Sequence, residues 1–239
     1  FGSSSGDFGR GVAVDSSGDV LVTGSFWFSV DFGGGALTSA GDRDIFVVKY
    51  AGADGGYRWA RRFGDTSTDD GWAVGADAPG NVIIAGRFFS ASVNFGGAAL
   101  ASAGSYDVFV AKFTPTGSHL WSRRSGSTGL DEAHGIAVDA SADVAVTGRF
   151  NGTVDFGGGG LVSAGNDEVF VAKYAGTDGA HRWSRRFGGF SADAGEGIAV
   201  DASGNVLVTG SVAAATVDFG TGPLLARGGA DAFLVRLAP

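Results

Sequence analysis

The chain has 239 residues, a net charge of −8 and no cysteine, which excludes disulfide frameworks and Cys-ligated metal sites and disfavours general nucleic-acid binding. Glycine supplies 44 residues, well above the usual share of about 7%, but without the period of collagen. Apolar residues make up 44% of the chain, which argues against disorder, and no apolar run reaches the roughly 18 residues of a membrane helix. We therefore expect a folded chain without a transmembrane segment.

Landmark residues recur every 62 positions along the whole chain. The recurring residues are an aspartate (Asp15, Asp77, Asp139, Asp201), a glycine (Gly24, Gly86, Gly148, Gly210) and a tryptophan (Trp59, Trp121, Trp183). The spacing of other recurring residues differs from 62 by one residue and later returns to 62, which indicates small loop insertions in one repeated unit. We place the repeats at about 1–62, 63–124, 125–186 and 187–239, within a single domain that spans 1–239.

Each repeat is predicted to contain four strands, which in the first copy lie at 11–15, 20–24, 44–50 and 57–63. Both faces of 44–50 are apolar, so we expect that strand to be covered on both sides. The first two strands are joined by a turn of the type Asp-x-Ser-Gly-Asp/Asn. Aspartate can accept from backbone N–H groups two residues on, and glycine tolerates positive φ, so this turn predicts a hairpin. The third copy has Ala142 at the position of this glycine.

A connection of about twenty residues separates the second and third strands of each repeat. It carries a recurring Val-Asp-Phe-Gly at 30–33, 154–157 and 217–220, followed in the first three copies by Leu-x-Ser-Ala-Gly. Structureless loops of this length are uncommon in compact domains. We therefore expect the connection to fold back and pack through its phenylalanine and leucine.

Four antiparallel strands in a unit of this length are typical of a β-propeller, and a parallel β-helix is the alternative. We expect an all-β, four-bladed ring built from four-stranded repeats of about 62 residues; the alternative is a fragment of a larger propeller. The last repeat lacks the Tyr-x-Trp-x-Arg-Arg strand, so it has no fourth strand unless one is supplied elsewhere. If the ring closes, residues 1–15 would lie beside residues 232–237.

The sequence Gly-Ile-Ala-Val-Asp-Ala-Ser-Gly-Asn-Val-Leu-Val-Thr-Gly at 197–210 resembles the SBBP-type β-propeller repeat, as do residues 107–112 and 183–188. The likeness extends over four copies and most of the chain. It implies propeller blades and a surface or secreted location in bacteria, without one shared activity. The family label implies seven blades, whereas this chain has four copies. No signal-peptide pattern precedes Phe1, which starts in the middle of a repeat, so we expect a processed or trimmed chain.

The hairpin turns carry oxygen-bearing side chains, the ligand type that Ca²⁺ prefers. Two such side chains per turn are too few for a complete site, and the EF-hand spacing is missing. We therefore expect structural turns that require no cofactor and keep calcium as the alternative. The residues concerned are Asp15, Asp19, Asp77, Asn81, Asp139, Asp143, Asp201 and Asn205.

Bulky residues that break the repeat are the candidates for ligand binding. They are Trp27, Phe28, Phe88, Phe89, Tyr106 and Phe150. Exposed aromatic residues of this kind mark binding surfaces. The alternative is that they fill space beneath the long connection.

Two repeated charged motifs are expected to be structural. In Trp-x-Arg-Arg, Arg61 shares a strand face with Trp59, which permits a cation–π pair, while Arg62 points the other way. The alternative for this motif is a stacking platform for sugars or bases. The acids that precede the third strand, such as Asp44, are expected to cap that strand or to pair with arginine.

We expect a non-enzymatic binding or scaffold module of a secreted or cell-surface bacterial protein, with its loops presented to a protein or carbohydrate partner. One alternative is a multivalent lectin with one sugar pocket per blade. Others are a hydrolase or lyase with carboxylates on the propeller axis, and a purely structural piece of a longer array. Nucleic acid is not expected as a partner, and the sequence leaves the oligomeric state open.

Overall fold

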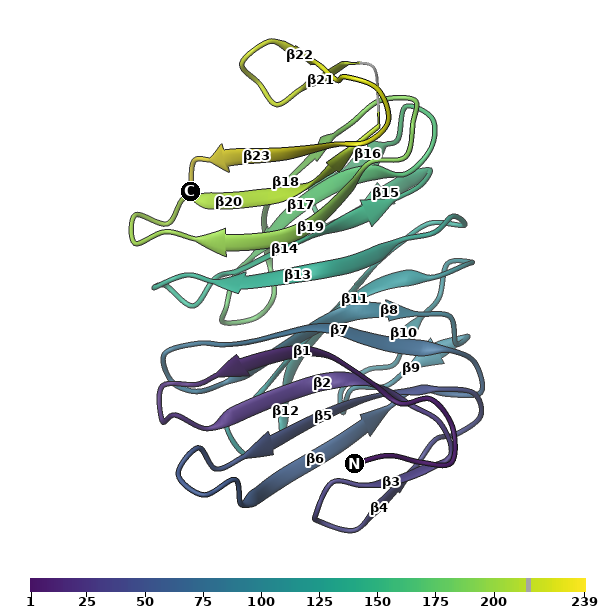
Figure 1. The fold of residues 1–239 in the computed structure, drawn as a ribbon, viewed down its shortest axis with the longest axis vertical. Helices are drawn as coiled ribbons and strands as arrows, with labels where there is room; N and C mark the ends of the chain where they lie inside the picture. Colours follow the sequence, from purple (N-terminus) through teal and green to yellow (C-terminus); the bar gives the residue numbers. More distant parts are fainter. Residues whose placement is uncertain (214–215) are drawn as a thin grey trace. The chain divides into compact units, whose positions relative to one another are not determined.

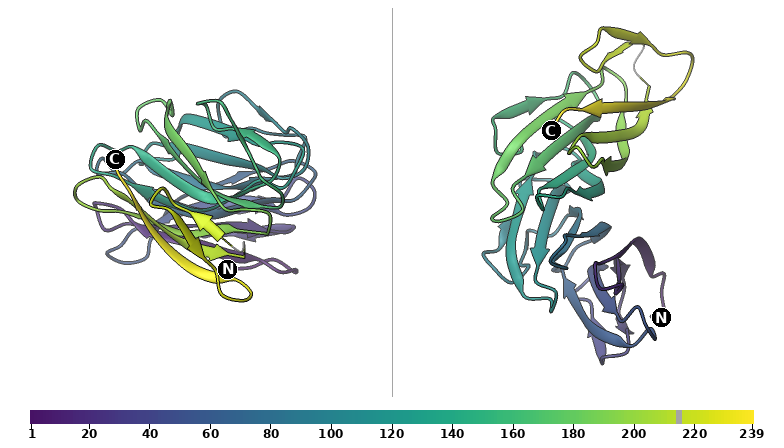
Figure 2. Two further views of the ribbon diagram at one scale, coloured as in Figure 1. Left: turned by 90° about the horizontal axis from the view of Figure 1, so that it is seen from above. Right: turned by 90° about the vertical axis from the view of Figure 1, so that its left-hand side faces the viewer.

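The computed structural model describes residues 1–213 and 216–239, which form antiparallel sheets joined by turns, without a helix among them (Figures 1 and 2). The same sheet recurs four times, and we call each sheet with its accompanying hairpin a blade. Blade 1 has the strand order β1 (Phe8–Val14), β2 (Val20–Phe26), β5 (Asp44–Tyr50) and β6 (Tyr57–Phe63). The all-β fold of repeated four-stranded sheets, typical of a β-propeller, is confirmed.

Blades 2 and 3 repeat this order, and blade 4 has three strands. Blade 2 contains β7 (Asp69–Ala76), β8 (Val82–Phe88), β11 (Asp107–Phe113) and β12 (His119–Ser125). Blade 3 contains β13 (Glu132–Val138), β14 (Val144–Phe150), β17 (Glu168–Tyr174) and β18 (His181–Phe187). Blade 4 contains β19 (Ala194–Val200), β20 (Val206–Val212) and β23 (Asp231–Leu237).

The chain divides into two compact units, one of residues 1–102 and 108–124 and one of residues 103–107 and 125–239. Within the first unit, β1 and β2 pack against β7, and within the second, β13 and β14 pack against β19. Each sheet pairs strands of its own repeat, so the ring, its blade number and the single domain stay predictions. None of the described residues forms a helix with the length and hydropathy needed to cross a membrane.

The core lies where the third strand of each complete blade is covered on both faces. All residues of β11 and β17 are buried, as are all but the last residue of β5. This confirms the expectation for residues 44–50. In the first unit, Leu21, Ile45 and Val47 of blade 1 belong to one apolar cluster with residues of blade 2 such as Val82 and Ile84.

The long connections fold back as two-stranded hairpins, as expected. These are β3 (Ser29–Asp31) with β4 (Ala36–Thr38), β9 (Ser92–Val93) with β10 (Leu100–Ala101), β15 (Thr153–Asp155) with β16 (Gly160–Val162), and β21 (Thr216–Asp218) with β22 (Pro223–Leu225). In the first hairpin Val30 and Phe32 are buried, and the Phe32 ring lies 4.6 Å from the Phe46 ring. The hairpins therefore extend the core of each blade.

The glycine that recurs in the second strand is required by a close backbone approach. A Cβ atom on Gly24, Gly86, Gly148 or Gly210 would lie 1.8–2.0 Å from a carbonyl oxygen of the first strand. In blade 2 that oxygen belongs to Asp70, beside the β-bulge between Gly71 and Ala73. Glycine therefore recurs at this position every 62 residues because a side chain there would clash with the neighbouring strand.

Gly86→Ala is expected to lower the free energy of unfolding by about 2 kcal/mol, because the new methyl group forces the two strands apart. The matched control is Gly9→Ala, since a Cβ on Gly9 in β1 would meet nothing within 4 Å. We expect this control to change stability by less than about 0.5 kcal/mol. Urea unfolding followed by tryptophan fluorescence measures both, and equal effects would contradict the packing argument.

Candidate functional site

The hairpin turns between the first two strands hold their aspartates in a repeated set of contacts. Asp15 Oδ1 accepts hydrogen bonds from the backbone N–H groups of Ser17 (2.9 Å) and Asp19 (3.0 Å), and its Oδ2 lies 2.6 Å from Lys49 Nζ. Burial raises the pKa of Asp15, but Lys49 and the turn N–H groups outweigh it and leave that pKa below its ordinary value. Ala142 adopts φ of 64°, the left-handed conformation that this position requires.

These contacts favour structural turns over calcium sites. The carboxylates at the start of the next two turns are also paired with lysine, Asp77 with Lys112 at 2.8 Å and Asp139 with Lys173 at 2.9 Å. An ammonium group in contact with the carboxylate opposes a second cation there. Among the described residues, no three His, Asp or Glu side chains are grouped to hold a metal ion. Calcium binding stays an untested alternative.

The aromatic candidates do not form one surface. Phe28 and Phe89 are exposed, at 56% and 46%, and Trp27 and Tyr106 are partly buried. Phe88 and Phe150 are fully buried, which corrects the expectation that they bind a ligand. Each of these two ends the second strand of its blade with its ring in the core. Phe88 is the last residue of β8, whereas the exposed Phe89 follows the end of that strand.

One edge of every blade carries side chains that differ between repeats, and we call it the variable edge. It combines the start of the first strand, the end of the second strand and the start of the third. Antiparallel pairing brings these three segments together, as the pairs Phe8–Ser25 and Phe26–Asp44 show in blade 1. Its residues are Phe8, Arg10, Trp27, Asp42 and Arg43 in repeat 1, Asp70, Trp72, Arg87 and Phe89 in repeat 2, Glu132, His134, Arg149, Asn151 and Asp167 in repeat 3, and Ala194, Glu196, Ser211, Ala213 and Ala230 in repeat 4.

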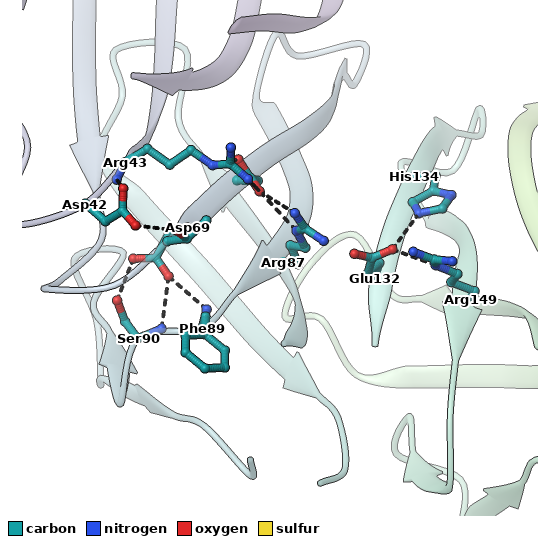
Figure 3. A network of polar contacts seen from close by, with 11 residues as sticks. Asp42, Arg43, Asp69, Arg87, Phe89, Ser90, Glu132, His134 and Arg149 are labelled. Carbon is teal, nitrogen blue, oxygen red and sulfur yellow. Dashed lines mark hydrogen bonds and ion pairs between the residues drawn. The ribbon is translucent and has the colours of Figure 1, made fainter. Parts of the chain in front are cut away.

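An aspartate supports the variable edge in each repeat, and it is buried in repeats 2, 3 and 4 and partly buried in repeat 1. The four residues Asp7, Asp69, Asp131 and Asp193 are 62 residues apart, and each accepts a hydrogen bond from the backbone N–H twenty residues later. Asp69 also accepts hydrogen bonds from Ser90 Oγ (2.6 Å) and from the N–H groups of Ser90 and Asp65 (Figure 3). Burial raises the pKa of Asp69 to about 6. The sequence prediction missed this set, although its 62-residue spacing could have revealed it.

In the first unit, the variable edge centres on the carboxylate of Asp70, which is fully buried. Arg43 Nε lies 2.8 Å from Asp70 Oδ1, and Arg87 Nη2 lies 2.9 Å from Oδ2 (Figure 3). The two arginines come from the start of β5 and the end of β8. One carboxylate therefore orients two guanidinium groups from different blades of the same unit.

Aromatic rings lie next to these guanidinium groups. Arg87 lies over the Trp72 ring at 5.4 Å, and Arg43 lies over the Trp27 ring at 5.1 Å. Arg10, which is exposed, lies 4.7 Å from the Trp72 ring centroid. Asp42 holds the Trp27 indole through a 2.5 Å hydrogen bond and accepts a second one from Thr68. We call this set of alternating cations and rings the arginine–aromatic cluster.

In the second unit, the variable edge is a network of acids and bases. Arg149 Nε donates to Glu132 Oε2 at 2.6 Å and its Nη1 donates to Asp167 at 3.1 Å. His134 Nε2 lies 3.3 Å from Glu132 (Figure 3), and its Nδ1 lies 3.0 Å from Glu196 in blade 4. Arg149 thus pairs with two of the acids, Glu132 and Asp167, and His134 lies between Glu132 and Glu196.

The repeated Trp-x-Arg-Arg motif is structural, as expected. Arg61 lies over the Trp59 ring at 5.7 Å, and the Trp59 indole donates to the carbonyl of Pro115 in blade 2 at 2.9 Å. Arg62 forms an ion pair with Asp44 at the start of β5. In blade 1 the motif therefore links the fourth strand to its own sheet and to blade 2.

Comparisons with known proteins agree with the fold. Residues 182–211 match the family model of the SBBP β-propeller repeat. The chain is also similar to the uncharacterized WD repeat-containing protein L264 of Acanthamoeba polyphaga mimivirus, with 24% identity over 187 residues that cover 69% of this chain and 13% of that protein. WD repeats likewise build four-stranded propeller blades. The segment 182–211, which runs from β18 through β20, is thus a β-propeller repeat of the SBBP type.

Proposed function

We propose that this chain is a non-enzymatic binding or scaffold module, and that the variable edge of its first unit contacts a protein partner. The observation that carries the proposal is the arginine–aromatic cluster, in which exposed Arg10 and Phe8 lie beside the partly buried Trp72 and Trp27. Arginine and tryptophan are the residues that contribute most to protein–protein interfaces.

The cluster is ordered before a partner arrives. Asp70 fixes Arg43 and Arg87, and Asp42 fixes the indole of Trp27. Side chains that are already held in place lose little conformational entropy on binding, which favours affinity. Asp7 and Asp69 also accept hydrogen bonds from the backbone N–H groups of Trp27 and Phe89, which holds the backbone of the edge in place. The WD repeats in the viral relative's name support a propeller module of this kind.

The partner surface that fits this cluster is acidic, because Arg10 is its exposed cation, while the exposed Asp42 already accepts hydrogen bonds from Trp27 and Thr68. We also propose a secreted or cell-surface location in a bacterium, which rests on the resemblance to SBBP-type repeats.

A peptide display library selected against the whole chain tests the proposal. We expect enrichment of peptides that contain Asp or Glu, and a loss of affinity of about tenfold in the Arg10→Ala chain. The matched control is Arg61→Ala, which removes an arginine that also lies over a tryptophan ring but belongs to the repeated motif. Thermal unfolding checks that both variants are folded. Selected peptides that bind both variants as tightly as the original chain, or the absence of any saturable binder, would refute the proposal.

A further inference from the structure

The residue that leads from β2 into the β3–β4 hairpin of blade 1 has a strained backbone. Phe28 adopts φ of 56°, in the left-handed region that residues with bulky side chains rarely occupy. Such strain persists only where the surrounding structure imposes it, and it is concentrated at functional sites. Among the described residues, Ala142 is the one other residue besides glycine with a positive φ, so the strain at Phe28 is unusual in this chain.

The fold requires this left-handed turn but does not require a phenylalanine in it. Gly152 occupies the same position in blade 3, with φ of 89°. The Gly152 carbonyl accepts a hydrogen bond from the N–H of Ser163 at 2.8 Å, just as the Phe28 carbonyl accepts one from Ser39 at 2.7 Å. Glycine adopts this conformation without steric cost and closes the same hairpin. Phenylalanine at position 28 therefore strains the backbone without a gain in local geometry.

The Phe28 ring lies largely outside the core. Phe28 is 56% exposed, whereas Phe26 at the end of β2 is fully buried. The neighbouring Trp27 ring contacts the Phe8 ring at 5.9 Å and the Arg43 guanidinium at 5.1 Å. Among the described residues, no aromatic ring or cation is paired with the Phe28 ring in this way. A strained residue with an exposed apolar ring points to a contact outside the chain.

Phe28 lies beside the arginine–aromatic cluster. The indole of the preceding Trp27 donates to Asp42, which also accepts a hydrogen bond from Thr68 at 2.9 Å. The Thr68 carbonyl in turn accepts a hydrogen bond from the backbone N–H of Phe89 at 3.0 Å. Phe89 of repeat 2 is 46% exposed, although blade 1 packs against blade 2. This part of the edge therefore stays open in a blade that has a neighbour, with apolar rings next to its charged groups.

We propose that Phe28 is the apolar anchor of the partner contact at the variable edge of the first unit, and that the partner protein presents an apolar pocket beside the acid that pairs with Arg10. Aromatic side chains that fill a pocket of the partner carry much of the binding energy of protein interfaces. The left-handed backbone, held by the hairpin, already fixes where this ring starts, so less conformational entropy is lost on binding. This role rests on the proposed function and adds a second feature of its partner, the apolar pocket.

Two substitutions to glycine separate binding from stability. Phe28→Gly and Ala142→Gly each place glycine in a left-handed conformation, and Ala142 lies in the β13–β14 turn, where the other three repeats have glycine. Both are expected to raise the midpoint of thermal unfolding by up to about 3 °C, because strain is relieved. With acidic peptides selected by display against the original chain, only Phe28→Gly is expected to weaken binding, by about tenfold.

Peptide variants then locate the contact of the ring. Alanine in place of the apolar residues of a selected peptide is expected to weaken binding to the original chain about tenfold, but to change binding to the Phe28→Gly chain by less than about twofold. Peptides that need Arg10 but bind the Phe28→Gly chain with unchanged affinity would overturn the anchor and leave the proposed function standing. The absence of any saturable binder would refute both.

Two other outcomes would also overturn the anchor. A lower unfolding midpoint of the Phe28→Gly chain would show that the ring supports the fold. Binding of the chain to vesicles of phosphatidylcholine and phosphatidylglycerol that is lost in Phe28→Gly would show that the ring enters a lipid surface instead of a protein pocket.

Discussion

Lys112→Met is expected to lower the free energy of unfolding by about 3–5 kcal/mol, because it leaves a buried carboxylate without its cation. Lys112 Nζ lies 2.8 Å from Asp77 Oδ2, and the two side chains are only 3% and 1% exposed. Methionine has a similar length and volume, so the loss of the charge dominates over any change in packing. Urea unfolding at pH 7 of the original chain and the variant gives the difference.

The fourth repeat supplies the matched control for this substitution. Arg236 and Asp201 occupy the same two positions, but they lie 3.6 Å apart with side chains 63% and 35% exposed. Arg236→Met is therefore expected to cost less than about 1 kcal/mol. Equal losses in the two variants would show that burial does not set the strength of this repeated pair.

Acidification adds a second measurement on Lys112→Met. Lys112 and Asn81 hold the pKa of Asp77 below its ordinary value against the opposing effect of burial. Without the lysine, burial dominates and the Asp77 pKa rises above that of the unfolded chain. The folded variant then takes up a proton more readily than the unfolded one, so its deficit is expected to shrink between pH 7 and pH 4. A deficit that stays constant over this range would contradict the ion-pair explanation.

The fold could be predicted because the same turns and close strand contacts require the same residues every 62 positions. The expected strands at 44–50 and 57–63 coincide with β5 and β6, and the hairpin turn begins at Asp15 as its side chain requires. Each of these features depends on neighbours in sequence, or on a residue that recurs in every copy.

The candidate site was harder to predict, because it depends on contacts between distant segments. Asp70 lies in β7, Arg87 in β8 and Arg43 just before β5, and only the fold brings the three together. The aromatic candidates were chosen because they break the repeat. This selection could not separate exposed Phe89 from buried Phe88, since the strand ends between them and the sequence does not mark that end. The role of Asp69 and Asp131 was not predicted, because it depends on backbone N–H groups twenty residues later that only the fold brings close.

Those buried aspartates are expected to make the chain less stable as the pH rises from about 4 to 7. Burial raises the pKa of Asp69 and of Asp131 to about 6, against the ordinary value of 3.8. Between these two values the folded chain keeps protons that the unfolded chain releases, so stability falls as the pH rises. Each group contributes about 3 kcal/mol, which is fully present below pH 4 and lost once the pH passes 6.

Carboxylates with lowered pKa values limit the stability of the folded chain at acidic pH. The pKa values of Asp15, Asp77 and Asp139 lie below their ordinary value, with burial opposed by paired lysines and turn N–H groups. Their contribution is present above pH 4 and is lost as the pH falls through their folded pKa values. The two sets together place the maximum of stability near pH 4–5, below the neutral range where many proteins are most stable.

Urea unfolding at pH 4.5, 6 and 7.5 measures this dependence on the original chain and on Asp69→Asn with Asp131→Asn. The double variant is expected to be less stable at pH 4.5, because an amide cannot accept the N–H groups at both of its terminal atoms. It should also lose most of the decline between pH 4.5 and 7.5, since neither position titrates. Asp54→Asn, which changes an exposed carboxylate, is expected to keep the decline. Stability that rises steadily from pH 4.5 to 7.5, or a decline that survives in the double variant, would show that these aspartates stay ionised in the folded chain.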